Sequence, residues 1–215
     1  MTPSEINTAA RDLYNASGDS FFTDSQVYNW IWQGCHELAK KAWLIERVYT
    51  TTTTASTQAY SYPSNTIAIK RITVNGKKIK RITMREDDAI TLSNQTAATE
   101  GWPIYYTDFN YTIYLRPIPD ASTYTIAIYS YNDAQQITAT SALEIPTLFH
   151  FDLVDYVLMR MFMKDKNADF VALHGAEWAQ HVKDAIAYKN RLKRTDGFAT
   201  VQSEDNLPVT ILGEA

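Results

Sequence analysis

TIAIKRITVNGKKIKRITM, residues 66–84, is the stretch of sequence that decides the fold. Asn75-Gly76 stands between two runs rich in β-branched residues, and this dipeptide is the strongest short-range signal of a β-hairpin. A type I′ turn at this dipeptide sets the register, which pairs Val74 with Lys77, Ile72 with Ile79, Ile69 with Ile82 and Ile67 with Met84. The stretch therefore predicts antiparallel β structure in the middle of the chain.

Four basic residues crowd one zone of this hairpin, namely Lys70, Arg71, Lys80 and Arg81. The same register places Arg71 opposite Lys80 and Lys70 opposite Arg81, and like charges directly opposed across a ladder are unfavourable. The cations therefore need an anionic partner, which could be the Glu86-Asp87-Asp88 run, another subunit or phosphate. We interpret them as a candidate docking patch, and a solvated face neutralised by the nearby acids is the alternative.

The threonine-rich stretch VYTTTTTASTQAYSY, residues 48–62, lies just before the hairpin. Threonine is β-branched and fits a pleated strand, whereas flexible linkers favour Gly, Ser and Pro. We therefore expect a strand over residues 44–54, a turn near 55–57 and a short returning strand, with a flexible linker as the alternative. Further strands are expected over 104–108, 111–116 and 123–132. Residues 44–132 are thus predicted to form an antiparallel β module, either a small sandwich or an open barrel.

Helices are predicted on both sides of this module. Capping boxes at Thr2 and Thr23 open two N-terminal helices, the first of which ends near Asn15. Pro146 is expected to start a third helix, and Ala168 begins a last one that extends to about residue 194. The predicted fold class is α+β, in which residues 1–43 and 133–194 form one helical domain, a bundle with the β module inserted. Residues 195–215 are predicted to form an extended C-terminal arm.

The composition restricts the class of function. The chain has 215 residues, is 45% hydrophobic and carries a formal net charge of −4, which argues against a protein that coats nucleic acid. Its N-terminus lacks the pattern of a signal peptide, and its most apolar window, residues 149–163, is too short to cross a bilayer. These observations predict a protein of the cytosol, or one that is assembled there.

The sequence contains no Gly-rich phosphate loop, no GxSxG and no CxxC pair, so we predict no catalytic apparatus and no cofactor. His174, Glu177 and His181 fall on one face of the last helix and could hold zinc. Their spacing is not HExxH, and such residues are common on exposed helix faces, so no metal site is predicted. Cys35 lies on the apolar stripe of the second helix, which indicates a core residue rather than a nucleophile.

The helix predicted after Pro146 is apolar on nearly every side, which is typical of a helix that is buried from several directions. In a chain of this size, part of that cover can come from another subunit. Met159 and Phe162 are therefore candidate positions of a subunit interface. The C-terminal arm contains a second candidate, because an extended apolar segment gains from ordering only against a partner. Its proposed anchor lies within residues 207–212 and comprises Pro208, Val209, Ile211 and Leu212.

The order of the sequence segments described above resembles that of the head-to-tail adaptor (connector) proteins of tailed bacteriophages, and the resemblance covers most of the chain. The matching phrases are SQVYNWIWQGCHELAKKA, the Thr-rich strand ending in Tyr62-Pro63, IKRITVNGKKIKRIT, WPIYYTDFNYTIYLRPIP, IPTLFHFDLVDYVLMRMFMKDK and a last helix with Trp178. The phrase before the hydrophobic helix, NDAQQITATSALEIP, departs from the more Pro-rich form that is familiar in the family.

The resemblance implies a structural protein of the virion rather than an enzyme. Such adaptors form a homo-oligomeric, dodecameric ring at the head–tail junction, with the portal protein above and a tail or nozzle protein below. Double-stranded DNA passes transiently through the channel, no membrane is involved, and assembly takes place in the host cytoplasm. The resemblance also implies that the C-terminal arm reaches a neighbouring subunit or the portal. A net charge of −4 suits a ring that should not grip DNA.

Two other functions are compatible with parts of the sequence. A carbohydrate-binding β module with helical flanks is one, because several aromatic side chains could offer stacking faces: Trp102, Tyr105, Tyr106, Tyr111 and Tyr114. A metal-dependent hydrolase that uses the histidines is the other. An adaptor should form rings or bind a portal, a sugar module should bind glycan as a monomer, and a hydrolase should lose activity with a chelator.

Overall fold

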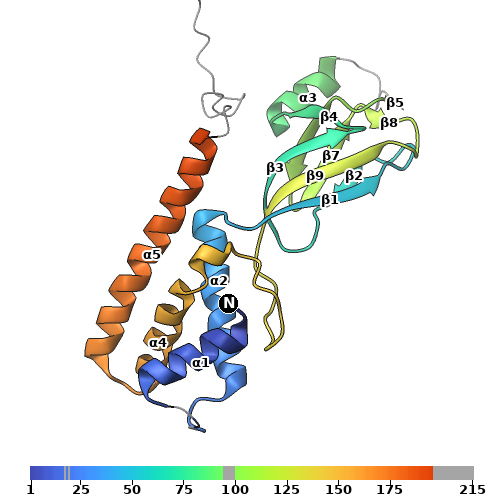
Figure 1. Cartoon of the computed structure of the whole chain (residues 1–215). Coiled ribbons are helices and arrows are strands. Elements are labelled where there is room, and N and C mark those ends of the chain that lie inside the picture. Colours follow the sequence, from blue (N-terminus) through green and yellow to red (C-terminus); the bar gives the residue numbers. More distant parts are fainter. Residues whose placement is uncertain (17, 19, 94–99, 196–215) are drawn as a thin grey trace, which may run out of the picture. The chain divides into compact units, whose positions relative to one another are not determined.

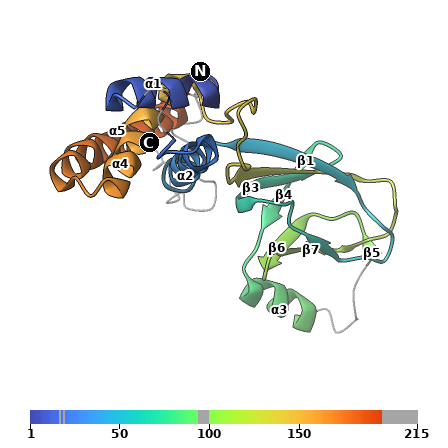
Figure 2. The ribbon, with the colours of Figure 1, turned by 90° about the horizontal axis from the view of Figure 1, so that it is seen from below.

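A computed structural model of the chain describes residues 1–16, 18, 20–93 and 100–195. Its contacts divide the chain into two compact units. The first, called the helical unit, comprises Met1–Leu44 and the described residues from Gln136 onward. The second, called the β unit, comprises Ile45–Gln135. Figures 1 and 2 show the elements of each unit from two directions.

The two N-terminal helices begin at the capping boxes predicted from the sequence. Helix α1 spans Pro3–Tyr14, and the hydroxyl of Thr2 accepts from the backbone N–H of Glu5. Helix α2 spans Asp24–Ala42, and Thr23 and Gln26 form the same reciprocal pair. The buried face of α2 includes Cys35, which is 1% exposed, as the apolar stripe predicted.

The hydrophobic segment after Pro146 forms two helices rather than one. A 3-10 helix, η1, spans Thr147–Phe149, and α4 follows over Asp152–Lys164. The expectation of a continuous helix from Pro146 was therefore wrong at its start, because the first turn is closed by i to i+3 hydrogen bonds such as that from His150 N–H to the Thr147 carbonyl. Helix α5 spans Ala168–Thr195 and agrees with the prediction.

Helix α4 contacts three helices of its own unit, α1, α2 and α5. Six of its side chains are buried, and they are Leu153, Val154, Tyr156, Val157, Leu158 and Met161. Helices α2 and α4 are close at Gly34, where an added Cβ would lie 2.8 Å from Cδ2 of Leu153. Within the described residues, much of the apolar surface of α4 is thus covered by the chain itself.

The β unit contains one curled, mostly antiparallel sheet of seven strands, a half-barrel that is closer to the predicted open barrel than to a sandwich. Its strand order is β1-β9-β3-β4-β6-β7-β2. The bounds are β1 Glu46–Thr52, β2 Ala59–Ser61, β3 Thr66–Val74, β4 Lys77–Arg81, β6 Tyr105–Phe109, β7 Thr112–Arg116 and β9 Thr125–Asn132. The Thr-rich stretch is therefore a strand, as expected. Two short segments, β5 Glu100–Gly101 and β8 Ile118–Pro119, form a separate parallel pair.

The hairpin around Asn75-Gly76 is confirmed at its tip but not along its length. Both turn residues have positive φ, 47° and 77°, as a type I′ turn requires. Strands β3 and β4 pair only from Val74↔Lys77 to Ile72↔Ile79. Beyond this point the first half of β3 continues to pair with β9, whereas β4 turns to pair in parallel with β6. The predicted pairs of Ile69 with Ile82 and Ile67 with Met84 were wrong.

Two other features of the β unit differ from the expectation. The returning strand β2 pairs with β7 rather than with β1. A helix that was not predicted, α3 over Met84–Ser93, follows β4 and contacts β6 (Figure 2). It begins with a capping box, in which the Glu86 carboxylate accepts from the backbone N–H of Thr83 and the Thr83 hydroxyl accepts from the N–H of Glu86. Thr83 and Glu86 have the spacing of a capping box, so the sequence contains the signal for this helix.

Candidate functional site

The four cations of the candidate docking patch are all exposed, and they do not oppose one another across a ladder. Lys70 forms an ion pair with Glu46 at 3.1 Å, and the guanidinium of Arg71 lies 4.0 Å from the centroid of the Tyr129 ring. The expected repulsion between Arg71 and Lys80, and between Lys70 and Arg81, was therefore wrong, because the β3–β4 ladder ends at Ile72↔Ile79.

Arg81 is the most strongly held of these cations. Its Nε and Nη2 donate to the two carboxylate oxygens of Asp108 at 2.7 and 3.0 Å, and the Tyr62 hydroxyl donates to the same carboxylate at 2.5 Å. Burial, followed by the hydrogen bond to Asp108, raises the pKa of Tyr62. Arg81 thus has a local structural partner.

Two carboxylates of the acidic run after the hairpin have local partners besides the cations of the patch. Glu86 caps α3, and hydrogen bonds from the backbone and hydroxyl of Thr83 lower its pKa, with a smaller contribution from the charge of Lys80. Asp87 accepts two hydrogen bonds from Arg116 at 2.8 and 3.2 Å. Whether the four cations of the patch dock a partner stays a prediction.

The candidate interface residues Met159 and Phe162 are half-buried on α4. The Phe162 ring packs on Tyr14, Phe170 and His174, with centroid distances of 4.8, 4.7 and 5.5 Å. Met159 lies beside α5, where its sulfur is 3.6 Å from the position of a Cβ added at Gly175. Both side chains therefore contact their own chain, and an additional contact with a neighbouring subunit stays a prediction. The proposed arm residues Pro208, Val209, Ile211 and Leu212 lie outside the described residues.

The aromatic residues proposed as a sugar platform do not all present their faces. Tyr106 is only 3% exposed, and both it and Trp102 pack with the core of the β unit. Tyr111, by contrast, is 74% exposed in the turn between β6 and β7. Stacking on glycans needs several open rings on one surface, so this arrangement offers less than the sequence predicted.

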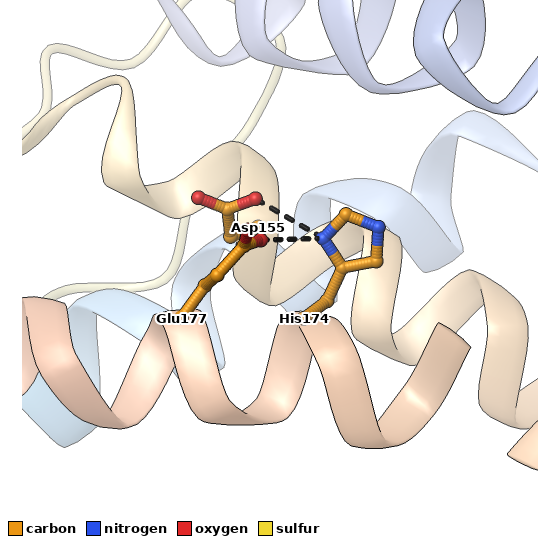
Figure 3. A group of neighbouring side chains, drawn as sticks. All are labelled: Asp155, His174 and Glu177. Atoms are coloured by element: carbon orange, nitrogen blue, oxygen red, sulfur yellow. Dashed lines mark hydrogen bonds and ion pairs between the residues drawn. The ribbon is translucent and has the colours of Figure 1, made fainter. Parts of the chain in front are cut away.

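A polar cluster joins α4 to α5 and is drawn in Figure 3. The α4–α5 cluster comprises Asp155, in the first turn of α4, together with His174 and Glu177 on one face of α5. His174 Nδ1 lies 3.2 Å from Oδ1 of Asp155 and 3.1 Å from Oε2 of Glu177. The structure thus brings Asp155 to the α5 residues, which sequence spacing on one helix could not reveal.

His181 contacts the same cluster from the next turns of α5. Its Nε2 lies 2.8 Å from Oδ2 of Asp155, and its Nδ1 lies 3.6 Å from Oδ1 of Asp152. Burial is the main cause of a raised pKa at Asp152, and the nearby His181 opposes this effect. Two histidines and two carboxylates of the facing helices are therefore neighbours, while Glu177 closes the cluster at the surface.

Comparison with known protein families identifies the family of this chain. The family model described as SU10 adaptor protein matches residues 1–204, which is most of the chain. The chain therefore belongs to the SU10 adaptor family, a family of phage head–tail adaptors, and the resemblance seen in the sequence is confirmed. Comparison with curated proteins finds no match. No helix among the described residues has the length and apolar character needed to span a membrane.

Proposed function

We propose that this protein forms the ring that joins the portal of a phage capsid to its tail. In this role it binds the portal above and a tail or nozzle protein below, and its twelve copies surround a channel through which DNA passes. The family match over residues 1–204 is the observation that carries the proposal. The net charge of −4 is compatible with a channel that does not bind DNA tightly.

Surface features of the helical unit support an interface beside Phe162. The neighbouring ring of Phe170 is stacked on Phe162 and remains 45% exposed, and Leu173, in the next turn of α5, is 52% exposed. Adjacent exposed apolar side chains are more typical of a contact surface than single scattered ones. We therefore retain Met159 and Phe162 as candidate interface positions, with Phe170 and Leu173 as the exposed part of the same surface.

Electron microscopy of the purified protein, alone and mixed with its portal, tests the proposal directly. We expect twelve-fold rings, either free or only on the portal. A protein that stays monomeric and does not bind the portal would contradict the proposed function.

A Met159→Glu variant tests the interface, with Met159→Leu as its matched control. The charged side chain should block assembly, whereas leucine conserves the volume and should assemble normally. Circular dichroism must show that the Met159→Glu monomer is folded. If glutamate unfolds the protein instead, Met159 belongs to the intramolecular core, and the interface lies elsewhere.

The docking patch is best tested with the two cations that lack a carboxylate within ion-pair distance in the described β unit, Arg71 and Lys80. Replacing both with Gln should leave stability nearly unchanged and weaken attachment to the portal or tail. Lys78→Gln on the same hairpin is the control. If attachment is as strong as in the wild type, these cations have no role in docking.

The C-terminal arm is tested by deleting residues 200–215. We expect the melting temperature of the monomer to stay nearly constant and portal binding to weaken. In the full-length chain, Ile211→Asp should reproduce the loss, while Gln202→Ala should not. A truncated protein that binds the portal as well as the full chain would rule out the arm as an anchor.

A further inference from the structure

The hydrogen bonds of the α4–α5 cluster do not satisfy all of its carboxylate oxygens. Two carboxylate oxygens, from Asp155 and Glu177, converge on the single Nδ1 atom of His174 at 3.2 and 3.1 Å (Figure 3). An imidazole nitrogen carries at most one hydrogen, so it cannot donate a full hydrogen bond to both acceptors. A cation between the three atoms would satisfy both carboxylates and use the lone pair of the nitrogen.

The distances fit such a cation. One ligand atom from each of the three residues lies within 4.8 Å of the other two. Zinc binds histidine nitrogen and carboxylate oxygen at about 2.0–2.2 Å, so neighbouring ligand atoms of a tetrahedral site are about 3.3–3.6 Å apart. The two observed separations from Nδ1 are only slightly shorter, and small side-chain rotations would suffice to admit the ion.

The surrounding side chains hold the ligands in place. The His174 ring is stacked on Phe162 with an interplanar angle of 5°, and Phe162 is stacked in turn on Phe170. His181 Nε2 contacts the far oxygen of Asp155 at 2.8 Å, which leaves Oδ1 directed toward His174. Outer partners of this kind orient metal ligands and strengthen binding in known sites.

The three side chains of the cluster differ in how far they are exposed to solvent. The side chains of His174 and Asp155 are 15% and 21% exposed, while that of Glu177 is 47% exposed. An ion can therefore enter from the side of Glu177. In helical proteins, metal sites are commonly built from side chains that face one another on neighbouring helices.

We propose that Asp155, His174 and Glu177 bind one divalent transition-metal ion of the zinc class, with water in the fourth position. Imidazole and carboxylate ligands suit zinc better than magnesium or calcium, which prefer oxygen alone. The ion connects the first turn of α4 to α5 and stabilises the helical unit. This role is independent of the adaptor function, and a ring that assembles without metal would not contradict it.

Isothermal titration of the untagged, full-length protein with zinc chloride, after removal of metal by a chelator, tests the site. We expect one saturable site per chain and a rise in melting temperature on binding, because the ion binds the folded state. Cobalt(II) should produce the visible absorption of a tetrahedral complex, and zinc should displace it.

Variants separate the ligands from the orienting residue. His174→Gln and Glu177→Gln should each weaken zinc binding at least about hundredfold, whereas His181→Gln should keep the stoichiometry and weaken binding about tenfold. His36→Gln, whose ring lies against Trp32 instead, and Asp165→Asn, on the exposed end of α4, are matched controls that should bind as the wild type does.

The proposal is overturned if the wild-type protein shows no saturable site, or if Glu177→Gln binds zinc as the wild type does. Glu177 is the decisive position because its half-exposed side chain can be changed with little risk to folding. Binding that is lost equally in the control variants would indicate adventitious coordination by surface histidines and would also overturn the proposal.

Discussion

The polar cluster between α4 and α5 of the helical unit differs from the arginine pairs of the β unit. In the β unit, two arginines each donate two hydrogen bonds to one aspartate, as Arg81 does to Asp108 and Arg116 to Asp87. In the helical unit, Asp155 of α4 is shared between His174 and His181 of α5. The two β-unit aspartates are thus each held by one bidentate arginine, whereas Asp155 is shared between two imidazole rings.

The two units also differ in what determines their packing. In the helical unit, side chains of long helices interlock, and a single glycine on α2 makes room for Leu153. In the β unit, strand order decides which residues meet, since β4 leaves β3 and pairs with β6. Substitutions at the α2–α4 contact should therefore act through volume, and substitutions in the arginine pairs of the β unit should act through hydrogen-bonded charge.

The largest effect is expected for Leu153→Ala in the helical unit. Leu153 is fully buried, and removing such a side chain costs about 2–5 kcal/mol of unfolding free energy, through lost burial and the cavity left behind. Urea unfolding, monitored by tryptophan fluorescence, measures this loss of unfolding free energy, because four of the five tryptophans lie in this unit. Leu148→Ala, at a residue that is 54% exposed, is the control and should change stability little. A small effect of Leu153→Ala would mean that α2 and α4 are less tightly packed than described.

The next effect concerns the two arginine pairs of the β unit. The Asp87 side chain is 8% exposed, so Arg116→Gln removes two charge-assisted hydrogen bonds from a buried carboxylate and should cost about 1–3 kcal/mol. The side chain of Arg81 is 55% exposed, and Arg81→Gln should cost less than about 1 kcal/mol. Hydrogen exchange of the backbone amides of β4 and β7 measures the loss of stability in both variants. Equal costs for the two variants would show that burial does not govern these pairs.

A smaller effect, whose size depends on Leu153, is expected at Gly34. Gly34→Ala places a Cβ 2.8 Å from Leu153, an overpacking that costs about 1–3 kcal/mol, of which the better helix propensity of alanine offsets about 1 kcal/mol. In a Leu153→Ala background the contact with Leu153 is absent and only two Tyr156 ring carbons at 3.3 Å remain close, so the same substitution should cost clearly less. A double-mutant cycle by urea unfolding tests this coupling. Additive effects would show that the two residues do not touch in solution.

The smallest effect concerns Cys35. Burial, with a contribution from the charge of Glu144, raises the pKa of its thiol from 9.0 to about 12. The folded state therefore retains a proton that the unfolded state releases, so this contribution to stability is present below pH 9 and is lost as the pH rises toward 12. Cys35→Ala should reduce the alkaline loss. A thiol reagent at pH 8 should modify the native protein far more slowly than the unfolded chain, and rapid modification of native protein would contradict the burial.

Local features of this protein were determined by short stretches of sequence. The capping boxes at Thr2 and Thr23 start α1 and α2, the Asn75-Gly76 turn forms the hairpin tip, and the Thr run is a strand. These features depend on hydrogen bonds and backbone preferences within a few residues, so the sequence contains all the information they need. The family could also be identified from the sequence, because the order of the matching sequence segments is a property of the sequence alone.

Only the tertiary structure decided which distant residues meet. Arg81 and Asp108 are 27 positions apart, and they pair because β4 lies beside β6, a neighbour that no turn signal specifies. Asp155 reaches His174 and His181 because α4 packs on α5, whereas periodicity places residues only on a face of their own helix. Strand order and helix contacts result from burying all apolar surfaces of a unit together, which no local segment can determine.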